Sequence, residues 1–337
     1  MREALLALLV ALPFGVGVAT GASGERPAPL FRFQDPEIVE SSGLALTDGG
    51  LVVTVNDSGD AARAFVVDPA TGRTVGTTRW EGGAEDVEAV APASGDTVYV
   101  GDIGDNGAVR DTISVVRVPV AARDQDVAGE RFALRYADGP ADAEALLVHP
   151  RTGRLVVVTK KVLGGQVYVA PEDLSTTGVG TLRPRGPVMS VVTDGAFLPD
   201  GDHLVLRDYT RAVVYSWPAL EPVAELDLPE QRQGESLAVT GEGAVLVGSE
   251  GLRSPVYEVA LPDLPAGPVS SSPSPSPSPS PSSSPGTYSR EGREIPEDPD
   301  RPRDPWPWLV GPAVAVVALV VLVLSLRPPR GQRDHPR

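Results

Sequence analysis

The chain has 337 residues, no cysteine, three histidines and a net charge of −16. The lack of cysteine excludes disulfides and thiolate metal sites, and so few histidines argue against a histidine-rich zinc centre. The negative charge disfavours nucleic-acid binding, because neutralising phosphates requires a basic surface. It favours divalent cations, or simply solubility.

Residues 1–22 are typical of a secretory signal peptide. A short charged start is followed by an apolar run from Ala4 to about Val18 and then by small residues. The apolar run is short for crossing a bilayer, and small residues are typical of a cleavage site. We therefore expect cleavage near Ala22 and export of the rest of the chain.

Residues 27–266 contain a repeat that opens with an acidic residue followed by a short apolar run. Its five copies align on the apolar positions Leu44, Val90, Leu146, Phe197 and Leu237. Copies that recur about every 40 to 56 residues have the size of β-propeller blades. No long helical pattern interrupts the short β-rich runs, so we expect an all-β propeller domain.

The number of blades follows from the ends of the repeat region. The fifth copy lacks a last strand before the region ends, and residues 30–33 could supply it. Pairing of the first strand with the last blade closes the ring and hides the sheet edges. We expect five blades, or six if the long second copy conceals an insertion.

Acidic residues recur where the chain enters the first strand of a blade or leaves the second. Both connections lie on one face of a propeller, so the carboxylates should surround one mouth of the central channel. Oxygen ligands without histidine or cysteine favour Ca²⁺, and Mg²⁺ next; the alternative is that these acids only cap turns. The candidate metal ligands are Asp57, Asp60, Asp86, Glu88, Asp102, Asp105, Asp142, Glu144, Asp194 and Glu235. Similar places are occupied by Glu40, Asp208 and Glu250.

Three basic residues are expected on the same face. Lys160, Lys161 and Arg207 lie where second strands end. Cations beside a ring of carboxylates could hold an anionic group, such as phosphate, that also contacts the metal. The alternative is that they only neutralise neighbouring acids.

The C-terminal part of the chain predicts a spacer and a membrane anchor. Residues 267–305 include a Ser-Pro alternation that favours an extended, disordered stalk. Residues 306–326 are apolar and long enough to cross a bilayer, with Trp306 and Trp308 at the outer interface. The arginines of residues 327–337 place this tail in the cytoplasm. We thus expect a single-pass protein of the cell membrane whose N-terminus and globular domain are extracellular.

A set of short acidic motifs carries a resemblance to known proteins. The motifs are Glu40-Ser-Ser-Gly-Leu44, Asn56-Asp-Ser-Gly-Asp60, Glu85-Asp-Val-Glu88, Gly101-Asp-Ile-Gly-Asp-Asn106 and Asp142-Ala-Glu-Ala-Leu146. They resemble a family of uncharacterised secreted bacterial β-propellers. The Asp-x-Glu element is also similar to that of phytase-like and esterase-like propellers. This resemblance implies a propeller fold, calcium at an acidic channel mouth and phosphoester chemistry.

Two functions remain open from the sequence. The first is a non-catalytic display module that binds an extracellular ligand, polymer or protein at the propeller mouth, with Ca²⁺ supporting the loops. The second is a calcium-dependent phosphoesterase, in which the metal polarises the ester and activates water. Glu88 or Glu144 would then hold the metal, and Lys160 or Arg207 the phosphate. The stalk and the single membrane helix favour the display module, because they position a domain without adding chemistry.

Overall fold

The computed structural model describes residues 27–57 and 59–264 of the chain. These residues form 21 strands and no helix. The predicted signal peptide 1–22, the spacer 267–305, the membrane span 306–326 and the tail 327–337 lie outside the described residues. Within the described residues no helix has the length and hydropathy needed to cross a bilayer.

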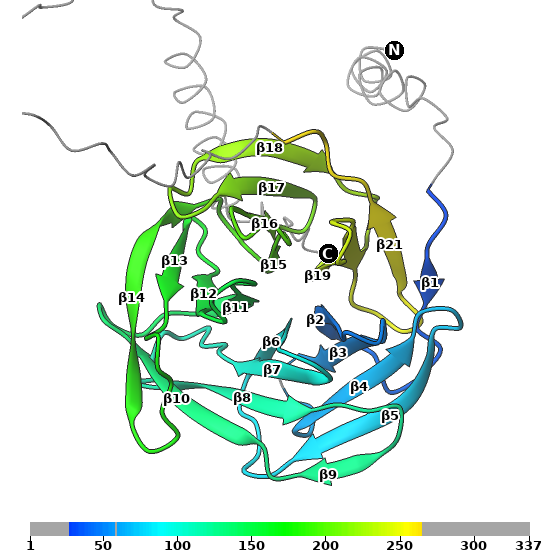
Figure 1. Cartoon of the computed structure of the whole chain (residues 1–337), viewed down its shortest axis with the longest axis horizontal. Coiled ribbons are helices and arrows are strands. Elements are labelled where there is room, and N and C mark those ends of the chain that lie inside the picture. Colours follow the sequence, from blue (N-terminus) through cyan, green and yellow to red (C-terminus); the bar gives the residue numbers. More distant parts are fainter. Residues whose placement is uncertain (1–26, 58, 265–337) are drawn as a thin grey trace, which may run out of the picture. The chain divides into compact units, whose positions relative to one another are not determined.

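The strands pair into four sheets that surround a common centre (Figure 1). One sheet contains β2 (Ser41–Leu46), β3 (Val52–Asn56), β4 (Arg63–Asp68), β5 (Arg73–Trp80) and β9 (Gln125–Val127). Another contains β15 (Asp194–Phe197), β16 (His203–Arg207), β17 (Arg211–Ser216) and β18 (Pro222–Asp227). A further sheet contains β19 (Ser236–Val239), β20 (Val245–Gly248), β21 (Pro255–Val259) and, from the other end of the sequence, β1 (Phe31–Arg32).

The remaining sheet has eight strands and consists of two antiparallel halves. The first half contains β6 (Val87–Pro92), β7 (Thr97–Asp102), β8 (Ile113–Pro119) and β10 (Glu130–Tyr136). The second half contains β11 (Ala143–Val148), β12 (Leu155–Thr159), β13 (Gly165–Val169) and β14 (Val179–Val188). The outer strands β10 and β14 pair in parallel, from Ala133 with Val179 to Tyr136 with Leu182. This pairing covers two outer edges that would otherwise be exposed.

The inner strands form a closed ring. β2 contacts β6, β6 contacts β11, β11 contacts β15, β15 contacts β19, and β19 returns to β2. The N-terminal strand completes the last sheet, since Phe31 pairs with Val256 and Arg32 with Pro255. The strand expected at residues 30–33 and its role in closure are therefore confirmed. The whole arrangement is all-β and propeller-like.

The long second repeat adds an edge strand. β9 pairs in parallel with β5, from Thr78 with Gln125 to Trp80 with Val127, and thus extends the sheet that begins with β2. Asp124 holds β9 beside β5, because its Oδ1 accepts a hydrogen bond from the Thr77 backbone N–H at 2.9 Å. The extra residues of this repeat therefore cover an outer strand.

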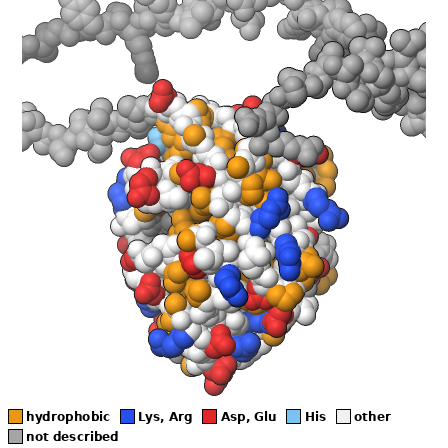
Figure 2. Space-filling view, turned by 90° about the vertical axis from the view of Figure 1, so that its right-hand side faces the viewer, with side chains coloured by type: hydrophobic (Ala, Val, Ile, Leu, Met, Phe, Trp, Pro, Cys, Tyr) orange, Lys and Arg blue, Asp and Glu red, His pale blue; other side chains and the backbone are white. Residues whose placement is uncertain are grey.

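The core lies between neighbouring sheets. One apolar cluster joins Val53 and Val66 of the sheet that begins with β2 to Val100 and Val116 of the eight-stranded sheet. β3 and β12, each of which pairs with an inner strand, are buried along their whole length. They are covered on both faces and so consist mainly of β-branched and apolar residues. On the outer face in Figure 2, acidic and basic side chains lie among hydrophobic ones.

A β-bulge recurs at the same place in three inner strands. The register shifts at Gly43 in β2, at Glu88 in β6 and at Glu144 in β11. These three positions are therefore equivalent, and the sequence alignment of Leu44 with Val90 was wrong by one residue, because the bulge cannot be seen in the apolar pattern. Gly43 has a φ of 78°, and a Cβ there would lie 2.6 Å from the backbone nitrogen of Val90.

Gly43→Ala should lower the free energy of unfolding by about 3 kcal/mol or more, because it combines left-handed backbone strain with a clash against a neighbouring strand. Gly50→Ala is the matched control: Gly50 has the same φ of 78°, but no atom lies within 4 Å of its added Cβ. The control should lose only about 1 kcal/mol. Urea unfolding of both variants of the full chain measures the difference, and equal losses would contradict the close approach of β2 to β6.

Candidate functional site

The bulges place two glutamates at one mouth of the central channel. An extra residue in a strand breaks the alternation of side chains and re-aims the bulged side chain. Glu88 and Glu144 are these extra residues in β6 and β11, near the ends where the strands begin. Both side chains are buried, with Glu88 only 3% exposed. In β6 and β11 the second acid of the Asp-x-Glu element is thus the bulged residue.

Five carboxylates from three sheets converge at this mouth. Asp57, Asp86 and Glu88 each offer an oxygen, and these oxygens lie within 4.8 Å of one another. Asp57 forms a second such group with Glu235 and Glu250. Asp57 follows β3, Asp86 and Glu88 begin β6, and the other two flank β19 and β20. We call these five residues the acidic cluster; Asp57 is common to both of its groups.

Burial and mutual repulsion favour protonation in the acidic cluster. Desolvation, followed by the charges of Glu144 and Asp57, raises the pKa of Glu88 to about 11. Desolvation and a hydrogen bond with Glu235 raise the pKa of Glu250 to about 9. Desolvation and the charge of Asp57 also raise the pKa of Asp86. Carboxylates held this close require protons or a cation.

Glu144 lies beside the cluster and has a cation of its own. Lys160 Nζ is 2.6 Å from Glu144 Oε1 and lies 5.3 Å from the centroid of the Tyr209 ring. Burial raises the pKa of Glu144 to about 8, and Lys160 limits the rise. Burial alone would lower the pKa of Lys160, but Glu144 more than offsets this and raises it. Lys160 therefore neutralises a neighbouring acid.

A glycine brings the backbone close to the cluster. A Cβ at Gly104 would lie 2.4 Å from Asp86 Oδ2 and 2.8 Å from Glu88 Oε1. The Gly104 backbone N–H donates to the Asp86 carbonyl at 3.1 Å, which fixes this approach. Only a residue without a side chain leaves these oxygens accessible from the Gly104 side. The spacing Gly-Asp-Ile-Gly contains this signal, but the contact between Gly104 and Asp86 requires the folded loop.

Other predicted ligands lie in turns and ion pairs. Asp60 accepts hydrogen bonds from Asn56 and Arg63. Asp102 accepts from the backbone of Asp86 at 3.0 Å and pairs with Arg110 at 2.8 Å. The carboxylate of Asp105 accepts from the backbone of Val109 and Arg110. Asp142 accepts from the Asp105 backbone at 2.8 Å. These four acids therefore bond to turns and to arginines, as the turn-capping alternative predicts. None of them belongs to the two carboxylate groups that contain Asp57.

Asp194 begins β15 and Arg207 ends β16, where the two residues pair, and both side chains are fully buried. Asp194 accepts backbone hydrogen bonds from Leu237 at 2.6 Å and Gly195 at 2.8 Å. The Arg207 guanidinium is 0% exposed and donates to the carbonyls of Ser236 and Gly248 and to Gln231. Burial raises the pKa of Asp194 and lowers that of Arg207 to about 10. Arg207 is enclosed by protein, where an anion from solvent does not reach it, whereas Lys161 is exposed.

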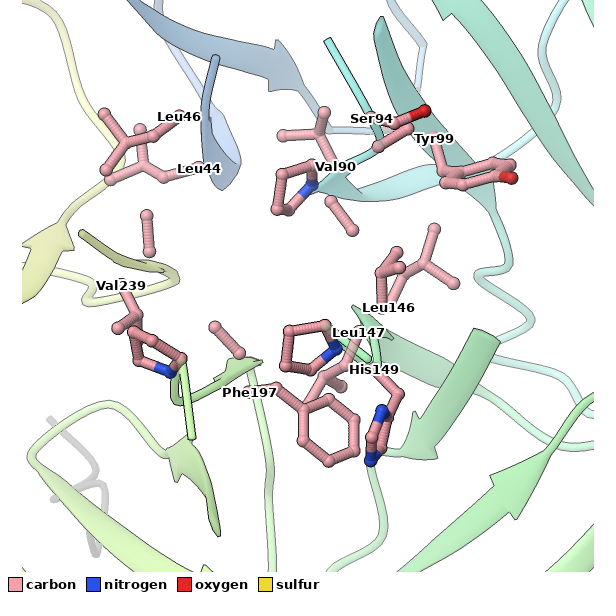
Figure 3. A pocket seen from close by; sticks show the side chains of 18 of the residues that line it. Leu44, Leu46, Val90, Ser94, Tyr99, Leu146, Leu147, His149, Phe197 and Val239 are labelled. Carbon is pink, nitrogen blue, oxygen red and sulfur yellow. The ribbon is translucent and has the colours of Figure 1, made fainter. Parts of the chain in front are cut away.

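The other end of the channel is apolar. A cavity of about 470 Å³ is lined by the inner strands where they leave the acidic face. Figure 3 shows Leu44, Val90, Leu146 and Val239 arranged around it, with His149 and Phe197 at one side. The same strands therefore begin among carboxylates and end in an apolar cavity. This cavity is not apparent from the sequence, because its residues resemble ordinary core positions.

No protein-family model matches the chain, and no curated protein matches it by sequence. Among solved structures it is similar to hydrazine synthase of Kuenenia stuttgartiensis, with 12% identity, a TM-score of 0.37, and coverage of 68% of this chain and 76% of that one. It is also similar to the Dos1 propeller, with 12% identity, a TM-score of 0.34, and coverage of 65% and 59%. The chain thus spans less than two thirds of the Dos1 chain. The resemblance of the acidic motifs to phytase-like propellers stays a prediction.

Arg207→Leu should lower the free energy of unfolding by about 3–5 kcal/mol, because it leaves the carbonyls of Ser236 and Gly248 without their donor and removes a positive charge that acts on the buried Asp194. Arg211→Leu is the matched control, since Arg211 lies on the next strand of the same sheet and makes only exposed ion pairs. It should cost less than about 1 kcal/mol. Urea unfolding measures both, and a small loss for Arg207→Leu would contradict its structural role.

Proposed function

We propose that the chain is an exported five-bladed propeller that is anchored by residues 306–326 and holds a divalent cation at its acidic mouth to bind an extracellular ligand. The count of five is supported by the five inner strands, each of which begins an antiparallel array of four strands. Export and anchoring rest on the sequence features of residues 1–22 and 306–337. The binding role rests on the acidic cluster.

The observation that carries the proposal is that Asp57 belongs to both close carboxylate groups. A single cation near Asp57 would be within reach of ligands from the beginnings of β6 and β19 and from the end of β20. All of these ligands are oxygens, which suits Ca²⁺ better than a transition metal. The space above Gly104, which a Cβ would fill, gives the ion access to Asp86 and Glu88.

Such a cation would serve binding more directly than catalysis. Ca²⁺ takes six to eight oxygen ligands, so a cation held by a few carboxylates keeps coordination positions for ligand oxygens. Two of the three cations expected to hold a phosphoester are engaged elsewhere, since Lys160 pairs with Glu144 and Arg207 is fully buried, whereas Lys161 is exposed. The geometry therefore favours the display module over a phosphoesterase.

Added Ca²⁺ should raise the unfolding temperature of the full chain relative to chelator, because an ion that binds only the folded state stabilises it by about 2.7 kcal/mol at a hundred times its dissociation constant. Mg²⁺ should give a smaller rise, since it demands a tighter octahedral shell. Asp57→Asn should remove most of the Ca²⁺ effect, because it weakens both carboxylate groups at once. Differential scanning calorimetry measures each shift.

Two control variants separate metal binding from damage to the loops. Asp60→Asn changes an acid in the same loop that pairs with Arg63, so it should retain the Ca²⁺ shift. Gly104→Ala should reduce the shift by obstructing Asp86 and Glu88, whereas Gly107→Ala, whose Cβ would meet only Val109 at 3.6 Å, should not. If Ca²⁺ does not raise the unfolding temperature of the unmodified chain, the metal site is not present and that part of the proposal is wrong.

In chelator, the unfolding free energy should fall as the pH rises from about 5 to 8. Glu88 and Glu250 of the acidic cluster have pKa values of about 11 and 9, so the folded chain binds more protons in this window than the unfolded chain, whose glutamates titrate near 4.3. Each retained proton contributes a slope of about 1.4 kcal/mol per pH unit. Saturating Ca²⁺ should flatten the slope, because it favours the ionised carboxylates. Urea unfolding at several pH values measures both curves, and a rising curve in chelator would contradict the buried cluster.

A further inference from the structure

The apolar cavity of about 470 Å³ at the far end of the channel is bounded by all five inner strands. Residues of the turns that follow these strands, such as Ser94, Pro150 and Gly241, also line it, so it reaches the face opposite the acidic cluster. Figure 3 shows the labelled side chains around an open centre. We call this space the channel cavity.

Small side chains at equivalent places leave this space. Counted back from the turn, the second paired residue of the inner strand is alanine in β2, β6, β15 and β19, and leucine in β11. Three of these alanines, Ala91, Ala196 and Ala238, line the channel cavity. Because the same small residue recurs in separate strands, the space is a regular feature of the inner ring rather than a single packing defect.

The channel cavity is too large and too apolar to be well filled by water. Voids in protein interiors rarely exceed one water molecule, whose share of liquid volume is about 30 Å³. Water in apolar surroundings has few hydrogen-bond partners, so an apolar ligand that displaces it gains affinity. Sites for small molecules typically have volumes of about 300 to 1,000 Å³ and mainly apolar linings. The channel cavity meets both conditions.

The charged side chains of the lining already have partners. Arg117 Nη1 lies 3.1 Å from Glu130 Oε2, and Asp48 Oδ2 accepts a hydrogen bond at 3.1 Å from the backbone of the β6–β7 turn. Burial, and then the charge of Arg151, lowers the pKa of His149, so its ring is neutral at pH 7. A charged ligand would therefore lose its hydration without gaining an unpaired counter-ion.

Aromatic side chains in the lining are held in place by their neighbours. The Phe197 ring lies 5.0 Å from the His149 ring and 5.2 Å from the Trp217 ring, measured between centroids. The Tyr99 ring lies 6.5 Å from the Phe132 ring. Rings that are already ordered lose little conformational entropy on binding, and they favour contact with the rings of a ligand.

We propose that the channel cavity binds a small, uncharged apolar molecule that contains rings. The volume accommodates such a molecule, the paired charges of the lining select against ions, and the ordered aromatic side chains supply a contact surface. This site is separate from the proposed cation site, because the two lie at opposite ends of the same inner strands.

Protection of an introduced thiol tests the binding without background, because the chain has no cysteine. Ala196→Cys puts a thiol in the lining of the channel cavity, in the full chain reconstituted in lipid nanodiscs so that no detergent competes. Ala224→Cys is the matched control: Ala224 is also partly buried and lies in the same row of the same sheet, across Val205 and Val214, but on the outermost strand. Mass spectrometry measures the rate of reaction with N-ethylmaleimide.

Phenylnaphthylamine, an uncharged aromatic probe, should slow the labelling of Ala196→Cys about tenfold at roughly ten times its dissociation constant. It should not slow the labelling of Ala224→Cys. Anilinonaphthalene sulfonate has the same rings and an added anionic group, so it should bind about ten times more weakly. An unreactive thiol in Ala196→Cys without probe, equal slowing in both variants, no slowing in either, or equal affinity for the two probes would overturn the proposal.

A second pair of variants tests whether the probe lies in the channel cavity itself. Gly241→Phe, combined with Ala196→Cys, should reduce the affinity for phenylnaphthylamine about tenfold by obstructing the mouth. Gly178→Phe with Ala196→Cys is the control, since both glycines are exposed and neither has an atom within 4 Å of an added Cβ, but Gly178 does not line the cavity. Full protection in the Gly241→Phe variant would show that the probe binds elsewhere and that the proposal is wrong.

Discussion

Closure of the ring by two residues of β1 is the constraint on which the site depends. Phe31 and Arg32 pair with β21, and Phe31, Phe33 and Ile38 are buried in the same apolar cluster as Val256. This contact joins residues about 225 positions apart in the sequence and so carries a large loop-closure entropy, which burial of the aromatic rings offsets. Without it, β19 would not lie against β2, and Asp57 would not meet Glu235 and Glu250. The acidic cluster is thus a product of closure.

Buried acidic side chains are compensated in three different ways in this domain. Where β15 begins and β16 ends, Asp194 is buried with Arg207 and backbone N–H groups, and the charges serve stability. At Glu144, a single lysine neutralises a single acid. In the acidic cluster, burial and then the neighbouring carboxylates raise the pKa values of Glu88 and Glu250. A divalent cation would neutralise these carboxylates. The opposite mouth of the channel is apolar and has no comparable group of charges.

The two faces of the domain have different chemistry because strand direction alternates. Residues that precede inner strands collect at the acidic mouth, and residues in the turns after them collect at the apolar cavity. The two ends of the same inner strands therefore offer different surfaces, with carboxylates at one end and apolar side chains at the other.

The sequence by itself determined the strands, the repeat and the strand that closes the ring, because alternating apolar runs and turn residues act locally. It also indicated that acids gather at one mouth, since their positions relative to the strands repeat. Only the tertiary structure decided which acids meet: a bulge at Glu88 and Glu144 re-aims their side chains, while Asp60 and Asp102 are held by Arg63 and Arg110. It likewise showed that Arg207 is enclosed. These outcomes depend on burial and on partners from other blades, which spacing along one chain does not encode.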